Sequence, residues 1–457
     1  MYVLNFKKFV LYGALITSLL IPQGYAIEEV SVADANIVKE ITFEHVIQKA
    51  IDHSYDLKIA DYNKLIAKEG IKGARSEYFP KLNLTAGTEY TKNFRDIFET
   101  TVMSVGENFI NPYTRYQAVL GINLTYNLFD FGVRKGNLDI AKEDVNIKEL
   151  ESEQKTQDLN LTLVDTYSKI LIAKHQIDIN KEILKLEENN LELKNRLFNA
   201  KEISSTELND EKVKVERVKT KINELTSMMD EAFNWLAFYT GEQYDIEQTK
   251  VAEIKKADFD LTAYKDYTKS VTWQIYEKQI KKKELELKVV KRTNYPKLYA
   301  YSRYYLYGSD RSSYKDSFGN VEPSNYTIGA SLNVPIFDGL KNNADIHKTA
   351  LELKQLQVER DKAIAELMTK LAVMRSNLIY IDEQIENNNN SIKELNEKQK
   401  SVKKLLSKKV VSPIEANDSK IELLEQTIEL EKNSITSIAL TRGIEILTRD
   451  SKNTSKK

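Results

Sequence analysis

The stretch YQAVLGINLTYNLFD, residues 116–130, decides the fold, because a variant of it, YTIGASLNVPIFD, recurs at residues 326–338. In both copies apolar residues occupy alternate positions, from Ala118 to Leu128 in the first copy. A period of two is typical of a β-strand with one apolar and one mostly polar face. Leu120 and Ile328 lie 208 residues apart, and the Phe-Asp pairs that end the two stretches have the same offset. The spacing indicates that the chain is a tandem duplication.

Each copy also contains an earlier strand and helices that precede it. The motif Pro-Lys-Leu opens a predicted strand twice, at residues 80–82 and 296–298. We therefore predict strands at about 81–91 and 116–130 in the first copy, and at about 297–307 and 326–338 in the second. Polar loops are predicted at 91–115 and 308–325, and helices at 42–76 and 263–292, from apolar residues spaced three and four apart.

A very long helical pattern follows the second strand of each copy. Residues 132–200 and 339–408 contain no proline, and in the second of these stretches apolar residues from Ile364 to Ile385 alternate in spacings of three and four. This is a heptad seam. Continued through both copies, the seam includes the polar residues Glu187 and Lys194 and places Asn180 and Asn388 at equivalent positions. Such an asparagine either sets the register or the oligomeric state of the helices, or is a solvated notch, a polar position in the seam that is open to water.

Each long helix is predicted to end at a short polar segment, after which a second helix returns. Ser204 and Ser412 are natural N-caps, and Pro413 suits a first helical turn. The predicted organisation is therefore a signal peptide (1–26), a first repeat (27–241) with a helical hairpin at 132–240, a linker (242–258), a second repeat (259–449) with a hairpin at 339–449, and a disordered tail (450–457).

The beginning of the sequence resembles a secretory signal peptide. Lys7 and Lys8 precede an apolar run from Phe9 to Ile21, and cleavage is expected after Ala26. The alternative, an uncleaved membrane anchor, is disfavoured because the run is short for a bilayer span. The 457 residues include no cysteine, which excludes disulfides and thiol chemistry. The 67 basic and 68 acidic residues leave no net positive charge that would attract nucleic acid.

Four strands with one apolar face cannot enter a membrane as an open sheet. The strand edges would leave backbone groups unsatisfied in hydrocarbon, at several kcal/mol each. A closed membrane barrel needs at least about eight strands, so several chains must each contribute a sheet. The long hairpins of such an oligomer would then form a tube below the barrel. This architecture predicts a conduit.

The order of the motifs resembles the TolC family of outer-membrane efflux proteins. The resemblance is carried by ITFEHVIQKA at 41–50, YFPKL at 78–82, NLFDFG at 127–132 and the duplicated strand and hairpin order. It implies a mainly α-helical homotrimer with a twelve-stranded transmembrane β-barrel in outer-membrane lipid, joined to an α-helical barrel in the periplasm. It also implies a periplasmic adaptor protein and an inner-membrane transporter of the RND (proton-driven) or ABC (ATP-driven) type, as in tripartite efflux or type I secretion systems.

The resemblance also suggests a periplasmic gate at the hairpin tips. The family's tip pattern, Ser-Pro followed by two acidic residues three apart, is present as Ser412-Pro413 with Glu415 and Asp418, and the equivalent positions in the first copy are Glu207 and Asp210. In a trimer these carboxylates would form rings around a pore. The alternative is that Glu415 and Glu207 only complement the dipoles of their helices.

The tips themselves are the expected docking surface for the adaptor. Lysine replaces the glycine that the family commonly has at the hairpin turn, which leaves the conformation of the turn open. The tip residues are Lys201, Ser204, Lys409, Ser412 and Pro413.

No other pattern indicates a cofactor, a metal site or catalysis. The four histidines, at 45, 53, 175 and 347, lack convincing metal-ligand spacing, and no phosphate loop, nucleophile elbow or zinc-protease motif occurs. Tyrosines at 299, 301, 304, 305 and 307 are interpreted as a barrel and interface girdle. The alternative function is an outer-membrane-anchored coiled-coil protein with a structural or adhesive role and no transport.

Overall fold

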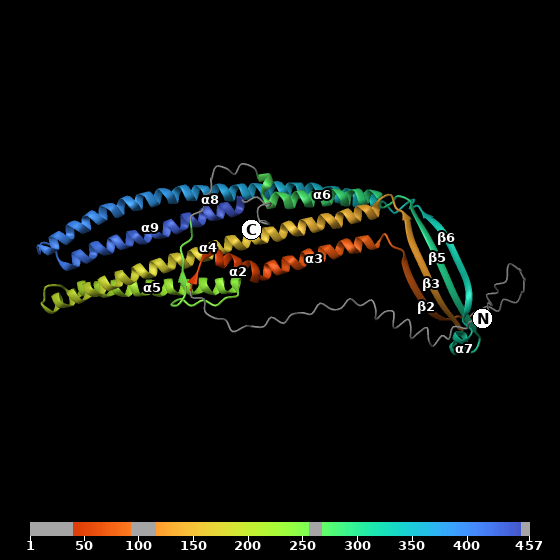
Figure 1. Ribbon diagram of the computed structural model, residues 1–457, viewed down its shortest axis with the longest axis horizontal. Coiled ribbons are helices and arrows are strands. Elements are labelled where there is room, and N and C mark those ends of the chain that lie inside the picture. The colour runs from red at the N-terminus through yellow and green to blue at the C-terminus, as the bar shows by residue number, and fades with distance from the viewer. Residues whose placement is uncertain (1–39, 93–115, 256–266, 449–457) are drawn as a thin grey trace, which may run out of the picture.

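The computed structural model describes residues 40–92, 116–255 and 267–448. The molecule is elongated, with long helical hairpins at one end and a four-stranded sheet at the other (Figure 1). The predicted signal peptide, the loop at 93–115 and the tail at 450–457 lie outside the described residues. Within the described ranges, no helix combines the length and the apolar character needed to cross a membrane.

The duplication is visible in the lengths of the helices. In the first repeat, α4 (Val133–Asn199) has 67 residues and α5 (Ser205–Thr240) has 36. In the second repeat, α8 (Lys341–Ser407) and α9 (Pro413–Thr448) have the same lengths at an offset of 208 residues. At about 1.5 Å per residue, each long helix extends roughly 100 Å. The tandem repeat of two strands and a helical hairpin is confirmed.

Shorter helices lead into each sheet segment. In the first repeat these are α2 (Phe43–His53) and α3 (Tyr55–Ser76). In the second repeat a 3-10 turn, η1 (Tyr267–Lys269), precedes α6 (Val271–Arg292). Of the helix predicted at 263–292, residues 263–266 lie outside the described residues. The helix α6 begins at Val271, because the Ser270 hydroxyl accepts a hydrogen bond from the Trp273 N–H and caps the helix there.

The sheet joins the two repeats. Its antiparallel order is β2 (Lys81–Tyr90), β3 (Tyr116–Phe129), β5 (Lys297–Asp310) and β6 (Glu322–Asn333), so β3 pairs with β5 across the repeats. The register places Ile122 opposite Leu84 and Tyr304, which gives one face an apolar character. Asn123 lies opposite Asn83 and Arg303 on the other, more polar face.

The second repeat differs from the sequence prediction at its strands. The strand predicted at 326–338 ends at Asn333, because its partner β5 begins at Lys297, directly opposite, and Pro335 has no N–H for a ladder bond. The predicted loop at 308–325 is largely structured. It contains the end of β5, the one-turn helix α7 (Tyr314–Gly319) and the start of β6.

The corner between strand and long helix needs left-handed backbone in both repeats. Phe131 and Gly132 have φ of 54° and 84°, and Gly339 and Leu340 have φ of 69° and 68°. In the first corner the carboxylate of Asp130 is buried and accepts hydrogen bonds from the backbone N–H groups of Gly132 and Arg134. These bonds hold the tight turn that the two Phe-Asp motifs mark in the sequence.

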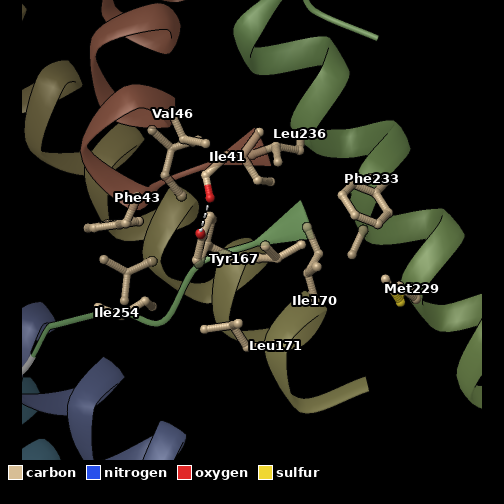
Figure 2. Close-up of a cluster of buried hydrophobic side chains, with 14 of the residues drawn as sticks. Ile41, Phe43, Val46, Tyr167, Ile170, Leu171, Met229, Phe233, Leu236 and Ile254 are labelled. Atoms are coloured by element: carbon tan, nitrogen blue, oxygen red, sulfur yellow. Dashed lines mark hydrogen bonds between the residues drawn. The ribbon is translucent and has the colours of Figure 1, made fainter. Parts of the chain in front are cut away.

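The main hydrophobic core lies midway along the molecule, where α2, α4 and α5 meet a small parallel sheet (Figure 2). This sheet pairs β1 (Glu40–Ile41) with β4 (Lys250–Val251). The fully buried Tyr167 hydroxyl donates a hydrogen bond to the Ala252 carbonyl at 2.7 Å and also lies 3.1 Å from the carbonyl oxygen of Ile41. The described part of the predicted linker is thus built into the core.

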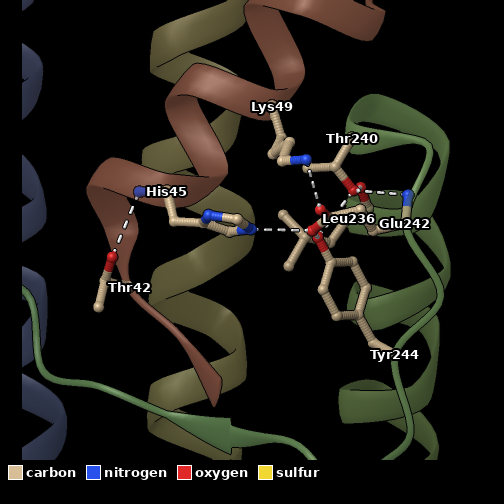
Figure 3. A network of polar contacts seen from close by, with 7 residues as sticks. All are labelled: Thr42, His45, Lys49, Leu236, Thr240, Glu242 and Tyr244. Atoms are coloured by element: carbon tan, nitrogen blue, oxygen red, sulfur yellow. Dashed lines mark hydrogen bonds and ion pairs between the residues drawn. The ribbon is translucent and has the colours of Figure 1, made fainter. Parts of the chain in front are cut away.

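A polar network joins α2 to the segment that follows α5, next to this core (Figure 3). The Glu242 carboxylate accepts from His45 Nε2 at 3.1 Å and lies 3.2 Å from Lys49 Nζ. The Tyr244 hydroxyl also donates to Glu242. The network fixes α2 against the end of α5, where Gly241 has φ of 71° and caps the helix.

Candidate functional site

The two hairpin turns lie together at the end of the molecule remote from the sheet (Figure 1). Each turn follows a Schellman motif with lysine in the left-handed position, at φ of 62° for Lys201 and 57° for Lys409. The N–H of Glu202 donates to the carbonyl of Leu197, and the N–H of Val410 to the carbonyl of Leu405. The replacement of glycine by lysine therefore leaves the turn intact, at the cost of a strained backbone.

The first acidic residue of each tip takes part in a capping box. The Glu207 N–H donates to the Ser204 hydroxyl at 3.2 Å, and Glu207 Oε1 accepts from the Ser204 N–H at 3.4 Å. In the second repeat the Glu415 N–H donates to the Ser412 hydroxyl at 3.1 Å, and Glu415 Oε2 accepts from the Ser412 N–H at 2.9 Å. Both glutamates are exposed, and their contacts within the chain are those of helix caps.

The second acidic residues differ between the repeats. Asp210 is exposed, and it has no hydrogen bond or ion pair among the described residues. Asp418 Oδ1 accepts a 2.9 Å hydrogen bond from Nδ2 of Asn190, a fully buried residue of α4. The side-chain oxygen of Asn190 accepts in turn from Asn417 at 2.8 Å. The two bonds fasten the start of α9 to α4, and we call them the Asn190 clasp.

Sequence reasoning did not predict Asn190, because asparagines are common on solvated helix faces and its partner lies 228 residues away. The only available signal was the polar part of the heptad seam around it. The sequence places Glu187 and Lys194 on that seam but indicates no role for them. The seam asparagines Asn180 and Asn388 are also buried, and Asn388 accepts from Gln426 at 2.8 Å, so neither is a solvated notch.

Two buried glutamates lie beside the clasp. Glu211 of α5 is fully buried and its Oε2 lies 2.7 Å from Lys194 Nζ, while Glu187 of α4 is also buried. Burial, the facing Glu211 carboxylate and the charge of Asp418 raise the pKa of Glu187 from 4.5 to about 7. Burial alone would also raise the pKa of Glu211, but its hydrogen bonds and Lys214 outweigh burial and lower it.

The sheet assigns the tyrosines of β5 to two faces. Tyr304 lies opposite Ile122 on the apolar face, whereas Tyr299, Tyr301, Tyr305 and Tyr307 lie opposite residues of the other face of β3. Tyr305 covers Gly121, where an added Cβ would come within 2.5 Å of the ring, and its hydroxyl donates to Asn123. Because successive side chains of a strand alternate in direction, the five tyrosines do not share one face, and the girdle stays a prediction.

Comparisons with known proteins agree with this architecture. A model of the outer membrane efflux protein family matches residues 46–242. A search of curated proteins found no match. Among solved structures, the CmeC outer membrane channel of Campylobacter jejuni superposes with a TM-score of 0.72 at 16% identity, covering 89% of this chain and 86% of that chain. The outer membrane protein VceC of Vibrio cholerae gives 0.71 at 14% identity, with coverage of 89% and 96%.

A third similar structure is the MtrE outer membrane channel of Neisseria gonorrhoeae in its open state, with a TM-score of 0.59 at 14% identity and coverage of 94% and 99%. These likenesses cover 89–94% of this chain and 86–99% of the other chains. Together with the family model over residues 46–242, they show that the chain has the fold of the TolC-like outer membrane efflux channels.

Proposed function

We propose that three copies of this chain form a passive export channel that crosses the outer membrane and extends into the periplasm. The four-stranded sheets of the three copies would close one barrel of twelve strands, and the hairpins would form the periplasmic tube. Channels of the family are in general trimers that work with adaptors and inner-membrane pumps. The channel itself then needs no energy source, because the pump supplies it.

The open edges of the sheet carry this proposal. β2 and β6 are the edge strands, and nearly every residue of both is exposed in the single chain. Exposed edges invite pairing with another strand, and in hydrocarbon unpaired backbone groups cost several kcal/mol each. Pairing β6 of one copy with β2 of the next satisfies both edges. The apolar face then contacts outer-membrane lipid, and the polar face with its tyrosines lines the lumen.

The hairpin tips are the proposed closed end and the docking surface for a periplasmic adaptor. The exposed turn residues Lys201 and Lys409 are suited to contact the adaptor, which would connect the channel to a transporter of the RND or ABC type. Carboxylates of Glu415 and Asp418, and of Glu207 and Asp210, would surround the opening as threefold rings. Such rings attract cations.

Conductance of the purified protein in planar bilayers tests the proposal. We expect a trimer in native mass spectrometry, single-channel openings, and block by divalent cations that weakens in the variant with Glu415→Ala and Asp418→Ala. Unchanged block would assign these residues to helix capping and to the clasp instead. A stable trimer that never conducts, in the wild type or in tip variants, would favour the structural or adhesive alternative.

A further inference from the structure

The buried carboxyl groups next to the Asn190 clasp have an incomplete set of hydrogen bonds. Oxygens Oε2 of Glu187 and Oε1 of Glu211 are both buried, and neither has a donor among the described residues. Lys214 connects the two side chains, because its Nζ lies 3.5 Å from Glu211 Oε2 and it lines the same cleft as Glu187. A buried ionised carboxylate that lacks donors is costly, and two such groups side by side repel each other, whereas a proton on one of them removes a charge and supplies a donor.

We propose that a proton shared between Glu187 and Glu211 controls how tightly α9 packs against α4. With the proton present, one carboxyl group donates to the other and the buried pair has a single negative charge. Without it, two facing carboxylates repel each other beside Asp418, which holds the start of α9 through the clasp. The proton thus strengthens the contact between α4 of the first hairpin and α9, the return helix of the second hairpin.

Among Lys194, Lys214, Glu211 and Asp418, the charges nearest to Glu187, the two signs balance only when Glu187 is neutral. Lys194 Nζ lies 2.7 Å and Lys214 Nζ 3.5 Å from Glu211 Oε2, which gives two cations. With Glu187 neutral, Glu211 and Asp418 match them, whereas an ionised Glu187 leaves one unmatched negative charge. The remaining charged groups in the adjoining cleft are one arginine of α5 and two glutamates of α9: Arg217, Glu422 and Glu425.

Protons can reach the pair from solvent. Glu187, Lys214 and Asp418 line the same open cleft at the surface of the hairpins. The pair therefore exchanges its proton without prior opening of the helices, and packing follows the external pH directly.

The direction of the effect follows from the raised pKa of Glu187. Packing binds the proton, so it is strongest at acidic pH and weakens as the pH rises through about 7. In the proposed channel the closed end would be firmer in acid and looser in alkali. That consequence rests on the function proposed above, whereas the packing switch does not.

Hydrogen exchange of the purified full-length protein tests the switch. The readout is exchange at residues 413–425, corrected for the intrinsic pH dependence of amide exchange. For a pKa that moves from 4.5 to about 7, the opening constant of the wild type should rise about tenfold between pH 6 and pH 8. Glu187→Gln, which is neutral and keeps a donor, should change less than about twofold over this range. The exposed neighbour Glu188 provides the control, and Glu188→Gln should behave as the wild type.

A tenfold pH dependence that persists in Glu187→Gln overturns the proposal, and so does a wild type without pH dependence. If Glu187→Gln does not fold, Glu211→Gln tests the same pair, because removal of the facing carboxylate should move the transition to lower pH. An unmoved transition in Glu211→Gln also overturns it. Exchange requires only the folded protein, so a failure to conduct in bilayers leaves this result interpretable.

Discussion

Replacing Tyr167 with phenylalanine tests whether one hydroxyl holds the core to the small parallel sheet. The ring is fully buried and packs edge to face on Phe43, and phenylalanine preserves that packing. The variant removes the 2.7 Å hydrogen bond to the Ala252 carbonyl. A partly buried acceptor that loses its donor costs about 1–2 kcal/mol. Because 1.4 kcal/mol corresponds to a factor of ten, local opening should become roughly 5- to 30-fold more frequent.

The backbone N–H of Ala252 reports this opening, because it donates to the Ile41 carbonyl at 3.0 Å. Native-state hydrogen exchange should show faster exchange at Ala252 in the variant. Tyr62→Phe is the matched control, since that side chain is 67% exposed and should leave exchange at Ala252 unchanged. Protection at Ala252 within twofold of the wild type, in an intact oligomer, would refute the assigned role of the hydroxyl.

Three further changes have defined outcomes. Lys409→Gly should stabilise the second tip by about 0.5–1 kcal/mol, because glycine adopts the left-handed conformation without strain. The stabilisation should appear as slower proteolytic cleavage of the turn, and the control Lys408→Gly, at a position with φ of −89°, should not slow cleavage. Gly136→Ala should lower the melting temperature, since the new Cβ would lie 2.3 Å from Val289 Cγ2. The second change Val289→Ala should restore part of the lost melting temperature, and additive effects of the two changes would argue against the contact. Burial would raise the pKa of Glu242, but hydrogen bonds from His45 and Lys49 outweigh burial and lower it, so the contribution of Glu242 to stability is present at neutral pH and is lost as the pH falls below 4.5. In Glu242→Gln, hydrogen exchange in α2 should lose this acid dependence, and an acid dependence equal to that of the wild type would contradict the assignment.

Much of the tip could be predicted because its determinants are local. Ser204 and Ser412 cap the return helices, and Pro413 begins α9, as short-range patterns indicated. The interaction of Asp418 could not be predicted in the same way. Its partner depends on how α9 is rotated against α4, and heptad periodicity defines which face is buried without defining which distant polar group it meets.

The sequence by itself determined the tandem repeat, the alternating strands and the pair of long helical hairpins, because each of these is written in periodicities of two or three to four residues and in a constant offset of 208. Only the tertiary structure decided the pairing of β3 with β5, the face on which each tyrosine of β5 lies, and the meeting of Glu187, Glu211 and Asp418 from three helices. These features depend on strand register and helix rotation, which are set by packing between segments far apart in the chain.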